Sequence, residues 1–308
     1  MSGIIPKWQM TEEDIKLNFI TPALSPKWNG RMTMETQITD GKINLRGNLV
    51  SRAQPKRADY VLYINANNPI AIVEAKDNQH AVADGLQQAM TYAQMLDVPF
   101  AYSSNGDAFR EHDFLMGTER DIAMEDFPTP DELYARFQKG ANGGAGLTQA
   151  EEAIIGQPYY SSQSTYPPRY YQRVAVNRTL DAIARGQNRI LLVMATGTGK
   201  TRTASSLTDV LSRGGHVTNV LFLADRTALV KQAKDDFKKY LPDQSLCNLC
   251  SSKDDKAARI VFSTYPTMLN AIDDTRSRDG RQLFTPAHFD LIIVDESHRS
   301  IFKKYRAI

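Results

Sequence analysis

The sequence is poor in cysteine, has no long apolar run and carries almost no excess of charge. Its two cysteines, Cys247 and Cys250, form one C-x-x-C pair with no second Cys/His pair nearby, which excludes a disulfide scaffold and a complete four-ligand zinc site built from such pairs. We interpret both as ordinary thiols in a reducing compartment. The apolar runs are far shorter than the roughly 20 residues of a membrane-spanning helix, and the N-terminus lacks a secretory signal. The sequence therefore predicts a cytoplasmic protein with no membrane partner.

The charge balance is close to neutral, with 37 Lys+Arg against 35 Asp+Glu and a net charge of +2. This argues against a protein that binds DNA by bulk positive charge alone. It is compatible with an enzyme that binds phosphates locally. The 308 residues are enough for two globular domains, each with a core of its own.

The first half of the chain alternates helix-like and strand-like patterns. A helix is predicted to begin at Thr11, because threonine is a favourable N-cap and acidic residues follow it. Two apolar runs, Ala58–Ile64 and Pro69–Ala75, flank a polar turn and predict a β-hairpin. A helix over Asp84–Leu96 and a strand over Pro99–Ser103 are predicted to follow.

The apolar periodicity then weakens over a stretch rich in glycine and, further on, in polar residues. We place the domain boundary in this stretch. Residues 1–140 are expected to form the first domain, 141–168 a linker and 169–308 the second domain.

The second half alternates short apolar runs with helix-like segments, a pattern typical of a parallel α/β sheet. Strands are predicted over Ile190–Met194, Val220–Ala224, Arg259–Ser263 and Leu291–Val294.

A phosphate-binding loop is predicted over residues 195–201, ATGTGKT, between an expected strand and a helix-like segment. Glycines in such a loop let backbone N–H groups surround phosphates, Lys200 would reach the β- and γ-phosphates, and the Thr201 hydroxyl would bind Mg²⁺. Met194 stands where the pattern G-x-x-x-x-G-K-[ST] has its first glycine, but the form ATGTGKT resembles the loop of superfamily 2 helicases. The nucleotide-binding residues assigned to this loop are Thr196, Gly197, Thr198, Gly199, Lys200 and Thr201.

A pair of acidic residues, Asp295 and Glu296, follows the last predicted strand. Asp295 suits a Mg²⁺ ligand and Glu296 a base that polarises water, and His298 would link the site to neighbouring elements. Taken alone, these residues also fit a solvated acidic turn. Their place behind a strand, downstream of the loop, favours an ATP site. Gln172 lies ahead of the loop, where superfamily 2 motors carry a glutamine that recognises adenine.

A second constellation consists of Asp59, Glu74 and Lys76. Alternation along a strand puts Glu74 and Lys76 on one face, and Asp59 lies opposite Glu74 if Ile70 pairs with Tyr63, a register that the sequence leaves open. The two carboxylates and a backbone carbonyl would hold Mg²⁺, and Lys76 would orient or deprotonate the attacking water. A surface Glu–Lys pair at a strand end is the plainer explanation of the same residues.

Gln88 and Tyr92 are four residues apart and share one face of the predicted helix. This Q-x-x-x-Y pattern resembles the helix beside the active site of RecB-like PD-(D/E)xK nucleases. The resemblance implies a further acidic residue from the first helix, either Glu12 or Glu13, and the sequence does not choose between them.

A nuclease followed by a superfamily 2 motor is the order found in the restriction subunit of type I restriction–modification enzymes. The chain resembles this family over nearly its whole length, for example in KRADYVLY, PIAIVEAKDN and VDESHRSIFKKYRAI. The resemblance implies an α/β architecture of a RecB-like nuclease domain and a first RecA-like domain. It also implies ATP-driven translocation and Mg²⁺-dependent cleavage of double-stranded DNA, with methyltransferase and specificity subunits as partners.

The sequence ends at Ile308 inside a helix-like segment, and no second RecA-like domain follows in it. We therefore interpret the chain as an N-terminal fragment that binds ATP without hydrolysing it. A DNA-repair helicase–nuclease or a type III restriction subunit is the first alternative, although type III subunits usually carry the nuclease after the motor. A non-catalytic nucleotide-binding assembly module is the second alternative, and the presence of every chemically demanding residue disfavours it.

Overall fold

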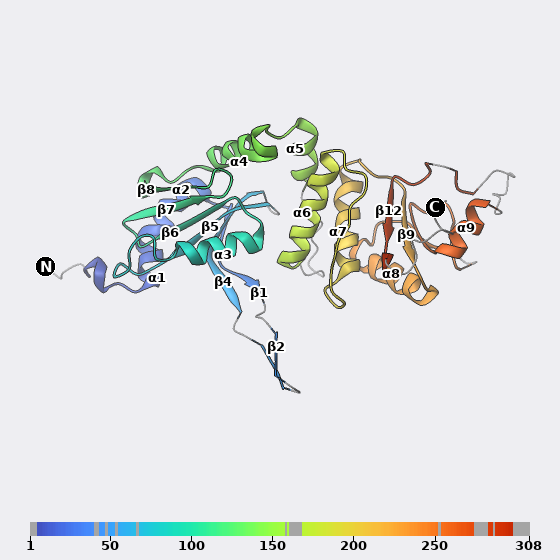
Figure 1. Ribbon diagram of the computed structural model, residues 1–308, viewed down its shortest axis with the longest axis horizontal. Coiled ribbons are helices and arrows are strands. Elements are labelled where there is room, and N and C mark those ends of the chain that lie inside the picture. Colours follow the sequence, from blue (N-terminus) through green and yellow to red (C-terminus); the bar gives the residue numbers. More distant parts are fainter. Residues whose placement is uncertain are drawn as a thin grey trace. The chain divides into compact units, whose positions relative to one another are not determined.

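The computed structural model describes residues 5–39, 43–46, 49–52, 55–65, 68–157, 159, 168–251, 254–273, 283–285 and 287–297. The chain divides into two compact units (Figure 1). The first unit comprises Met1–Pro158 together with Arg169–Val174, and the second comprises Tyr159–Pro168 together with Ala175–Ile308. Each unit is built around its own β-sheet.

A six-stranded mixed sheet forms the centre of the first unit. Its strands, in spatial order, are β1 (Met32–Thr39), β4 (Lys56–Asn65), β5 (Asn68–Ala75), β6 (Phe100–Ser104), β7 (Ala108–Asp113) and β8 (Thr118–Ala123). A separate ribbon pairs β2 (Ile43–Arg46) with β3 (Leu49–Arg52). Only β5 and β6 run parallel among the neighbours of the large sheet, and helix α3 (Leu86–Leu96) makes the crossover that a parallel pair needs.

Helices pack on both faces of this sheet. One face carries Leu24, Trp28 and Leu133, and the other carries Ala89 and Ala93 of α3. The helical elements of the unit are η1 (Lys7–Gln9), α1 (Glu12–Ile15), η2 (Lys16–Ile20), α2 (Thr21–Trp28), α3, η3 (Met124–Asp126), α4 (Pro130–Gly144) and α5 (Gln149–Ile155). Helix α6 (Tyr170–Ala184) begins in the first unit and continues into the second. Throughout the described ranges, no helix is both long enough and apolar enough to span a bilayer.

The predicted helix start at Thr11 is confirmed. The Thr11 side chain accepts a hydrogen bond from the Asp14 backbone N–H, and the Asp14 carboxylate accepts one from the Thr11 backbone N–H. These reciprocal bonds satisfy donors that a helix leaves free at its N-terminus. A π-helical turn, η2, then joins α1 to α2.

The predicted hairpin is also confirmed, as the antiparallel strands β4 and β5. Tyr60 pairs with Val73, and continuing this register places Asp59 opposite Glu74. Of the register that the sequence left open, the structure shows that Tyr63 pairs with Pro69 and not with Ile70, because the ladder shifts after Leu62. Pro69 has no N–H to donate, so a regular ladder cannot pass through it.

Helix α4 runs through part of the glycine-rich stretch in which the sequence indicated a connector. At Gly140 an added Cβ would lie 2.8 Å from Cδ1 of Leu115. The glycine therefore permits close packing between the helix and Leu115, and it does not mark a loop. Sequence composition cannot distinguish these two uses of glycine.

A four-stranded sheet forms the second unit, and all its neighbouring strands run parallel, as predicted. In spatial order the strands are β10 (Leu246–Asn248), β11 (Ile260–Thr264), β9 (Val220–Ala224) and β12 (Leu291–Val294). The helices of the unit, besides α6, are α7 (Lys200–Arg213), α8 (Thr227–Tyr240) and α9 (Tyr265–Asp273).

The strand predicted over Ile190–Met194 is wrong. These residues form no strand, and Leu191 and Val193 are 75% and 90% exposed. A strand exists only where a neighbour supplies hydrogen bonds. In the described part of the second unit β12 pairs with β9 alone, and no strand lies beside residues 190–194.

A buried ion cluster ties α4 to the sheet of the first unit. Glu111 is 1% exposed and accepts hydrogen bonds from Tyr102, Arg120 and Arg136, at 2.5–2.8 Å for the shortest bond from each. Arg136 also donates to Asp113 at 2.7 Å. Burial by itself raises the pKa of Glu111, but these donors outweigh it and hold the pKa below its ordinary value of 4.5.

We expect Arg136→Ala to lower the free energy of unfolding of the first unit by roughly 3 kcal/mol at pH 7, because it leaves a buried carboxylate without its main partner. Stabilisation by a carboxylate of lowered pKa is present above pH 4.5 and is lost as the pH falls through the folded-state pKa. The difference in the free energy of unfolding between the parent and Arg136→Ala should therefore become smaller at acidic pH. Urea titrations followed by tryptophan fluorescence measure this unit, since both tryptophans, Trp8 and Trp28, belong to it.

Arg110→Ala is the matched control. Arg110 binds Glu119 and Asp121, which are 40% and 67% exposed, so its loss should cost below about 1 kcal/mol. Equal costs for the two arginines would contradict the structural role given to Arg136.

Candidate functional site

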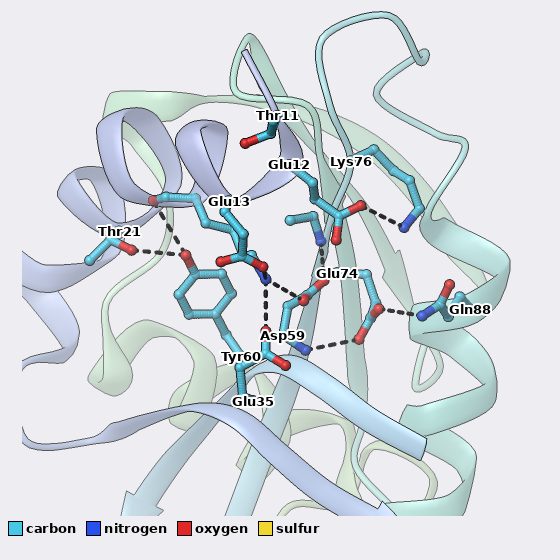
Figure 2. A network of polar contacts seen from close by, with 12 residues as sticks. Thr11, Glu12, Glu13, Thr21, Glu35, Asp59, Tyr60, Glu74, Lys76 and Gln88 are labelled. Atoms are coloured by element: carbon cyan, nitrogen blue, oxygen red, sulfur yellow. Dashed lines mark hydrogen bonds and ion pairs between the residues drawn. The ribbon is translucent and has the colours of Figure 1, made fainter. Parts of the chain in front are cut away.

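Two carboxylates lie side by side on strands β4 and β5. The Asp59 backbone N–H donates to Oε1 of Glu74 at 3.3 Å, and the Ala75 backbone N–H donates to Oδ2 of Asp59 at 2.8 Å (Figure 2). Each carboxylate is thus oriented by the backbone of the neighbouring strand. The hairpin brings Asp59 and Glu74 together, as the sequence led us to expect.

Glu74 is 1% exposed, although it carries an ionisable group. Burial, with the negative charge of Asp59 beside it, raises the pKa of Glu74 from 4.5 to about 9. Its Oε2 atom accepts a hydrogen bond from Gln88 of α3 at 2.7 Å. The carboxylate is held in a dry position where a proton or a cation is needed to offset its charge.

The predicted partners on α3 are close to Glu74. Gln88 donates both to Glu74 and, at 3.3 Å, to the Tyr92 hydroxyl, so the spacing of four residues places both on the same face of the helix. Lys76 follows the end of β5, and its ammonium lies 3.4 Å from Oε2 of Glu12.

The structure distinguishes Glu12 from Glu13, a choice that the sequence leaves open. Glu12 faces Lys76, whereas Glu13 lies 2.5 Å from the ammonium of Lys16. Lys16 in turn donates to Oδ1 of Asp59 at 3.0 Å and to Glu35 at 2.7 Å.

Lys16 and Glu35 were not anticipated from the sequence. Lys16 stands three residues after Glu13, a spacing typical of an exposed helical ion pair, yet it is 2% exposed. The sequence signal for a buried Lys16 is that it is a lone lysine beside the buried apolar residues Ile15, Ile20 and Leu24. Nothing in the sequence marks Glu35.

The donor chemistry at Asp59 and Glu74 suits a hard divalent cation, which prefers carboxylate oxygens. A cation at Glu74 would also offset the repulsion between the two carboxylates. Across the described ranges, no group of three or more acidic, histidine or cysteine side chains is arranged to hold a metal ion. An ion bound here would therefore take its remaining ligands from backbone, water or substrate.

A second polar site joins distant segments of the second unit. The Lys200 ammonium donates to Oε1 of Glu296 at 2.6 Å, and the Asp295 backbone N–H donates to the Leu223 carbonyl at 2.9 Å. The turn after β12 thus meets the start of α7. Burial raises the pKa of Asp295, and Glu296 has a φ of +52°, a left-handed conformation that strains a non-glycine residue.

The loop before α7 contains two glycines in the left-handed conformation, but the strand expected ahead of it, over Ile190–Met194, does not form. Gly197 and Gly199 have φ values of +80° and +82°, which glycine adopts without steric cost. Thr196 is exposed, Thr198 donates to the Ala195 carbonyl at 2.6 Å, and Thr201 lies in the first turn of α7. Helix α7 begins directly after this loop, and backbone N–H groups at a helix N-terminus favour anions.

Of the two other residues assigned to the nucleotide, the structure describes Gln172 alone. Gln172 is buried, accepts a hydrogen bond from the Arg169 backbone N–H at 2.9 Å and belongs to the first unit. His298 lies outside the described residues. Their roles remain predictions.

Two families match successive parts of the chain. Residues 42–120 match the family described as type I restriction enzyme R protein N terminus, and residues 165–308 match the family described as type III restriction enzyme, res subunit. The chain is similar to the EcoAI endonuclease subunit of a type I restriction enzyme from Escherichia coli, with 39% identity over 94% of this chain and 36% of the relative.

Further similarity comes from a second relative and a solved structure. The EcoKI endonuclease subunit from Escherichia coli K12 is 28% identical over 79% of this chain and 24% of the relative. A fragment assigned to an HsdR subunit of a type I restriction enzyme from Vibrio vulnificus YJ016 matches with a TM-score of 0.74 and 32% identity, over 94% of this chain and 52% of that one. The chain thus spans about a quarter to a third of the length of these curated relatives.

The raised pKa of Glu74 predicts a pH dependence of stability in metal-free protein. Between pH 4.5 and about 9 the folded chain retains a proton that the unfolded chain has released. The free energy of unfolding should therefore fall as the pH rises across this window. Glu74→Gln, which cannot ionise, should lack this decrease and be more stable than the parent near pH 9. Urea titrations in EDTA, repeated across this pH range, measure the free energy of unfolding of the parent and of Glu74→Gln. Parallel pH dependences in the two proteins would contradict the prediction.

Proposed function

The chain belongs to the family of type I restriction enzyme endonuclease subunits, and on that basis we propose that its first unit cleaves DNA and its second binds ATP. One observation carries the proposal for the first unit: a buried carboxylate, Glu74, lies against Asp59 and close to Gln88. Burying two acidic groups together costs stability unless a cation or proton offsets them. Such an arrangement is typical of functional sites.

We assign the chemical roles as follows. A bound Mg²⁺ would supply Lewis-acid activation of the phosphodiester and of a water molecule. Asp59 and Glu74 would hold that ion, and Lys76 would orient the water and stabilise negative charge on the phosphate. Gln88 fixes the orientation of Glu74 through its 2.7 Å hydrogen bond and is supported by Tyr92. Glu12 is the better candidate for the further acidic residue, because it faces Lys76.

For the second unit we propose Mg²⁺–ATP binding at the loop before α7. Thr196, Gly197, Thr198 and Gly199 would surround the phosphates. Lys200 would exchange its contact with Glu296 for the β- and γ-phosphates, while Thr201 and Asp295 would bind Mg²⁺. Glu296 would polarise the attacking water in a complete motor. Gln172 and His298 are assigned to this site by resemblance to superfamily 2 motors.

The proposed partners are double-stranded DNA and the methyltransferase and specificity subunits of a restriction complex, in the cytoplasm. ATP-driven translocation is proposed for the full-length subunit, since the chain spans only part of its relatives. The order of the two family matches along the chain supports a type I enzyme over a type III subunit or a repair helicase–nuclease.

The first test is nicking of supercoiled plasmid in the presence of Mg²⁺ or Mn²⁺. We expect the parent chain to nick DNA, and Glu74→Ala to lose at least about a hundredfold in rate, because it removes a ligand of the catalytic ion. Glu125→Gln is the matched control, since Glu125 is exposed and belongs to the same unit. Nicking that survives in Glu74→Ala, or no nicking by the parent, would count against the proposed cleavage site.

A separate test addresses the nucleotide. Lys200→Ala should weaken the binding of a fluorescent ATP analogue by at least about tenfold, because it removes a charge-assisted contact to the phosphates. Lys238→Ala, which replaces an exposed lysine of α8, should bind like the parent. Equal affinities in the parent and in Lys200→Ala would exclude the loop as the phosphate site.

A further inference from the structure

A two-stranded ribbon is inserted between two strands of the sheet in the first unit. Strands β2 and β3 follow β1 and precede β4 in the chain, and within the described ranges they pair only with each other (Figure 1). Thr39 at the end of β1 pairs with Lys56 at the start of β4. The ribbon therefore arises from this end of the β1–β4 ladder and is not part of the six-stranded sheet.

The segment that contains the ribbon is strongly basic, although the whole chain has a net charge of only +2. Residues 41–58 include no acidic residue, and their basic residues are Lys42, Arg46, Arg52, Lys56 and Arg57. Arg46 lies in β2 and Arg52 in β3, while Lys56 and Arg57 are exposed at the start of β4. Such a local cluster of positive charge is the electrostatic signature of a surface that binds a polyanion.

The candidate cleavage site lies at the same end of the ladder. Asp59 follows Lys56 by three residues in β4, which is about 10 Å along an extended strand. The Lys56 ammonium lies 5.6 Å from the ring centroid of Tyr92, whose hydroxyl accepts a hydrogen bond from Gln88. Gln88 also donates to Glu74. Positive charge at the base of the ribbon is therefore close to the side chains that surround the buried carboxylates.

The composition of the segment favours duplex DNA over a single strand as the polyanion. Proteins bind single strands largely by stacking bases on aromatic side chains. Residues 41–58 contain no aromatic residue. A two-stranded β-ribbon fits the major groove of B-form DNA, and arginine and lysine bind the phosphates that border it. Duplex DNA is also the substrate proposed for the neighbouring carboxylates.

We propose that the ribbon of β2 and β3 is a DNA-binding element that holds the duplex beside the cleavage site. Arg46 and Arg52 bind phosphates from the ribbon, and Lys56 and Arg57 bind them at its base. Phosphate contacts fix the position of a duplex and carry no direct information about base sequence. The ribbon therefore positions DNA without selecting a target sequence. This inference rests on the proposed cleavage of DNA by the first unit.

The test measures the affinity of the full chain for a short DNA duplex in EDTA, without nucleotide, over a range of salt concentrations. The double variant Arg46→Ala, Arg52→Ala should bind at least about tenfold more weakly at low salt. Its slope of log K against log salt should be smaller in magnitude by about 1.8, because each phosphate contact accounts for about 0.9. Arg46→Lys with Arg52→Lys keeps both charges and should keep the parent slope.

Arg31→Ala with Lys139→Ala removes the same amount of charge elsewhere in the first unit and serves as the comparison. Both residues are exposed; Arg31 precedes β1 at the end away from the ribbon, and Lys139 lies in α4. This variant should bind with the parent affinity and slope. An equal loss in it and in the double alanine variant of the ribbon would reveal a general charge effect and refute the proposal.

The other outcomes separate the ribbon from the cleavage site. A ribbon alanine variant with the parent affinity and slope would overturn the inference, as would loss of binding in the lysine variant or tighter binding of single-stranded than of duplex DNA. In plasmid nicking, the ribbon alanine variant should have a raised KM and the parent rate at saturating DNA. Glu74→Ala should bind the duplex like the parent in EDTA. Failure of the cleavage site would therefore appear in nicking alone, and failure of the ribbon in binding.

Discussion

Two carboxylates placed side by side away from water repel each other, and each has lost the hydration that stabilises its charge. The arrangement of Asp59 and Glu74 imposes this cost on the first unit. Hydrogen-bond donors from β4, β5 and α3 offset this cost. The Ala75 and Asp59 backbone N–H groups donate to the carboxylates, and Gln88 of α3 donates to the more deeply buried one. Without these donors the pair would not persist in a folded sheet.

The same requirement explains features of the fold that are otherwise irregular. A regular α-helix over residues 12–28 would not contain the π-helical turn that begins at Lys16, and a regular β1 would not have a left-handed residue at Glu35. The first departure brings the Lys16 ammonium to Asp59, and the second brings Glu35 to the same ammonium. Local strain at a site is retained when the surrounding contacts stabilise it, and here the surrounding contacts are ion pairs.

In the second unit a different physical constraint acts on the proposed site. Its proposed ligand, a phosphate group, is recognised by backbone N–H groups and one lysine, so the site depends on loop conformation more than on burial. Lys200 and Glu296 are 96 residues apart in the chain and meet where the turn after β12 lies against the start of α7. Glu296 supplies the negative charge that Lys200 contacts in this structure.

Sequence alone determined the elements whose cause is local. The cap at Thr11, the hairpin of β4 and β5, the face shared by Gln88 and Tyr92, and the parallel strands β9, β11 and β12 follow from capping, turn and periodicity rules that act over a few residues. Tertiary structure decided the rest. Residues 190–194 have the pattern of a strand, but no described strand lies beside them. Gly140 allows α4 to pack closely against Leu115. Glu12 and Glu13 are neighbours in sequence, yet they contact different lysines. The partners of Lys16 come from α1, β1 and β4, and no local pattern encodes which side chains distant segments bring together.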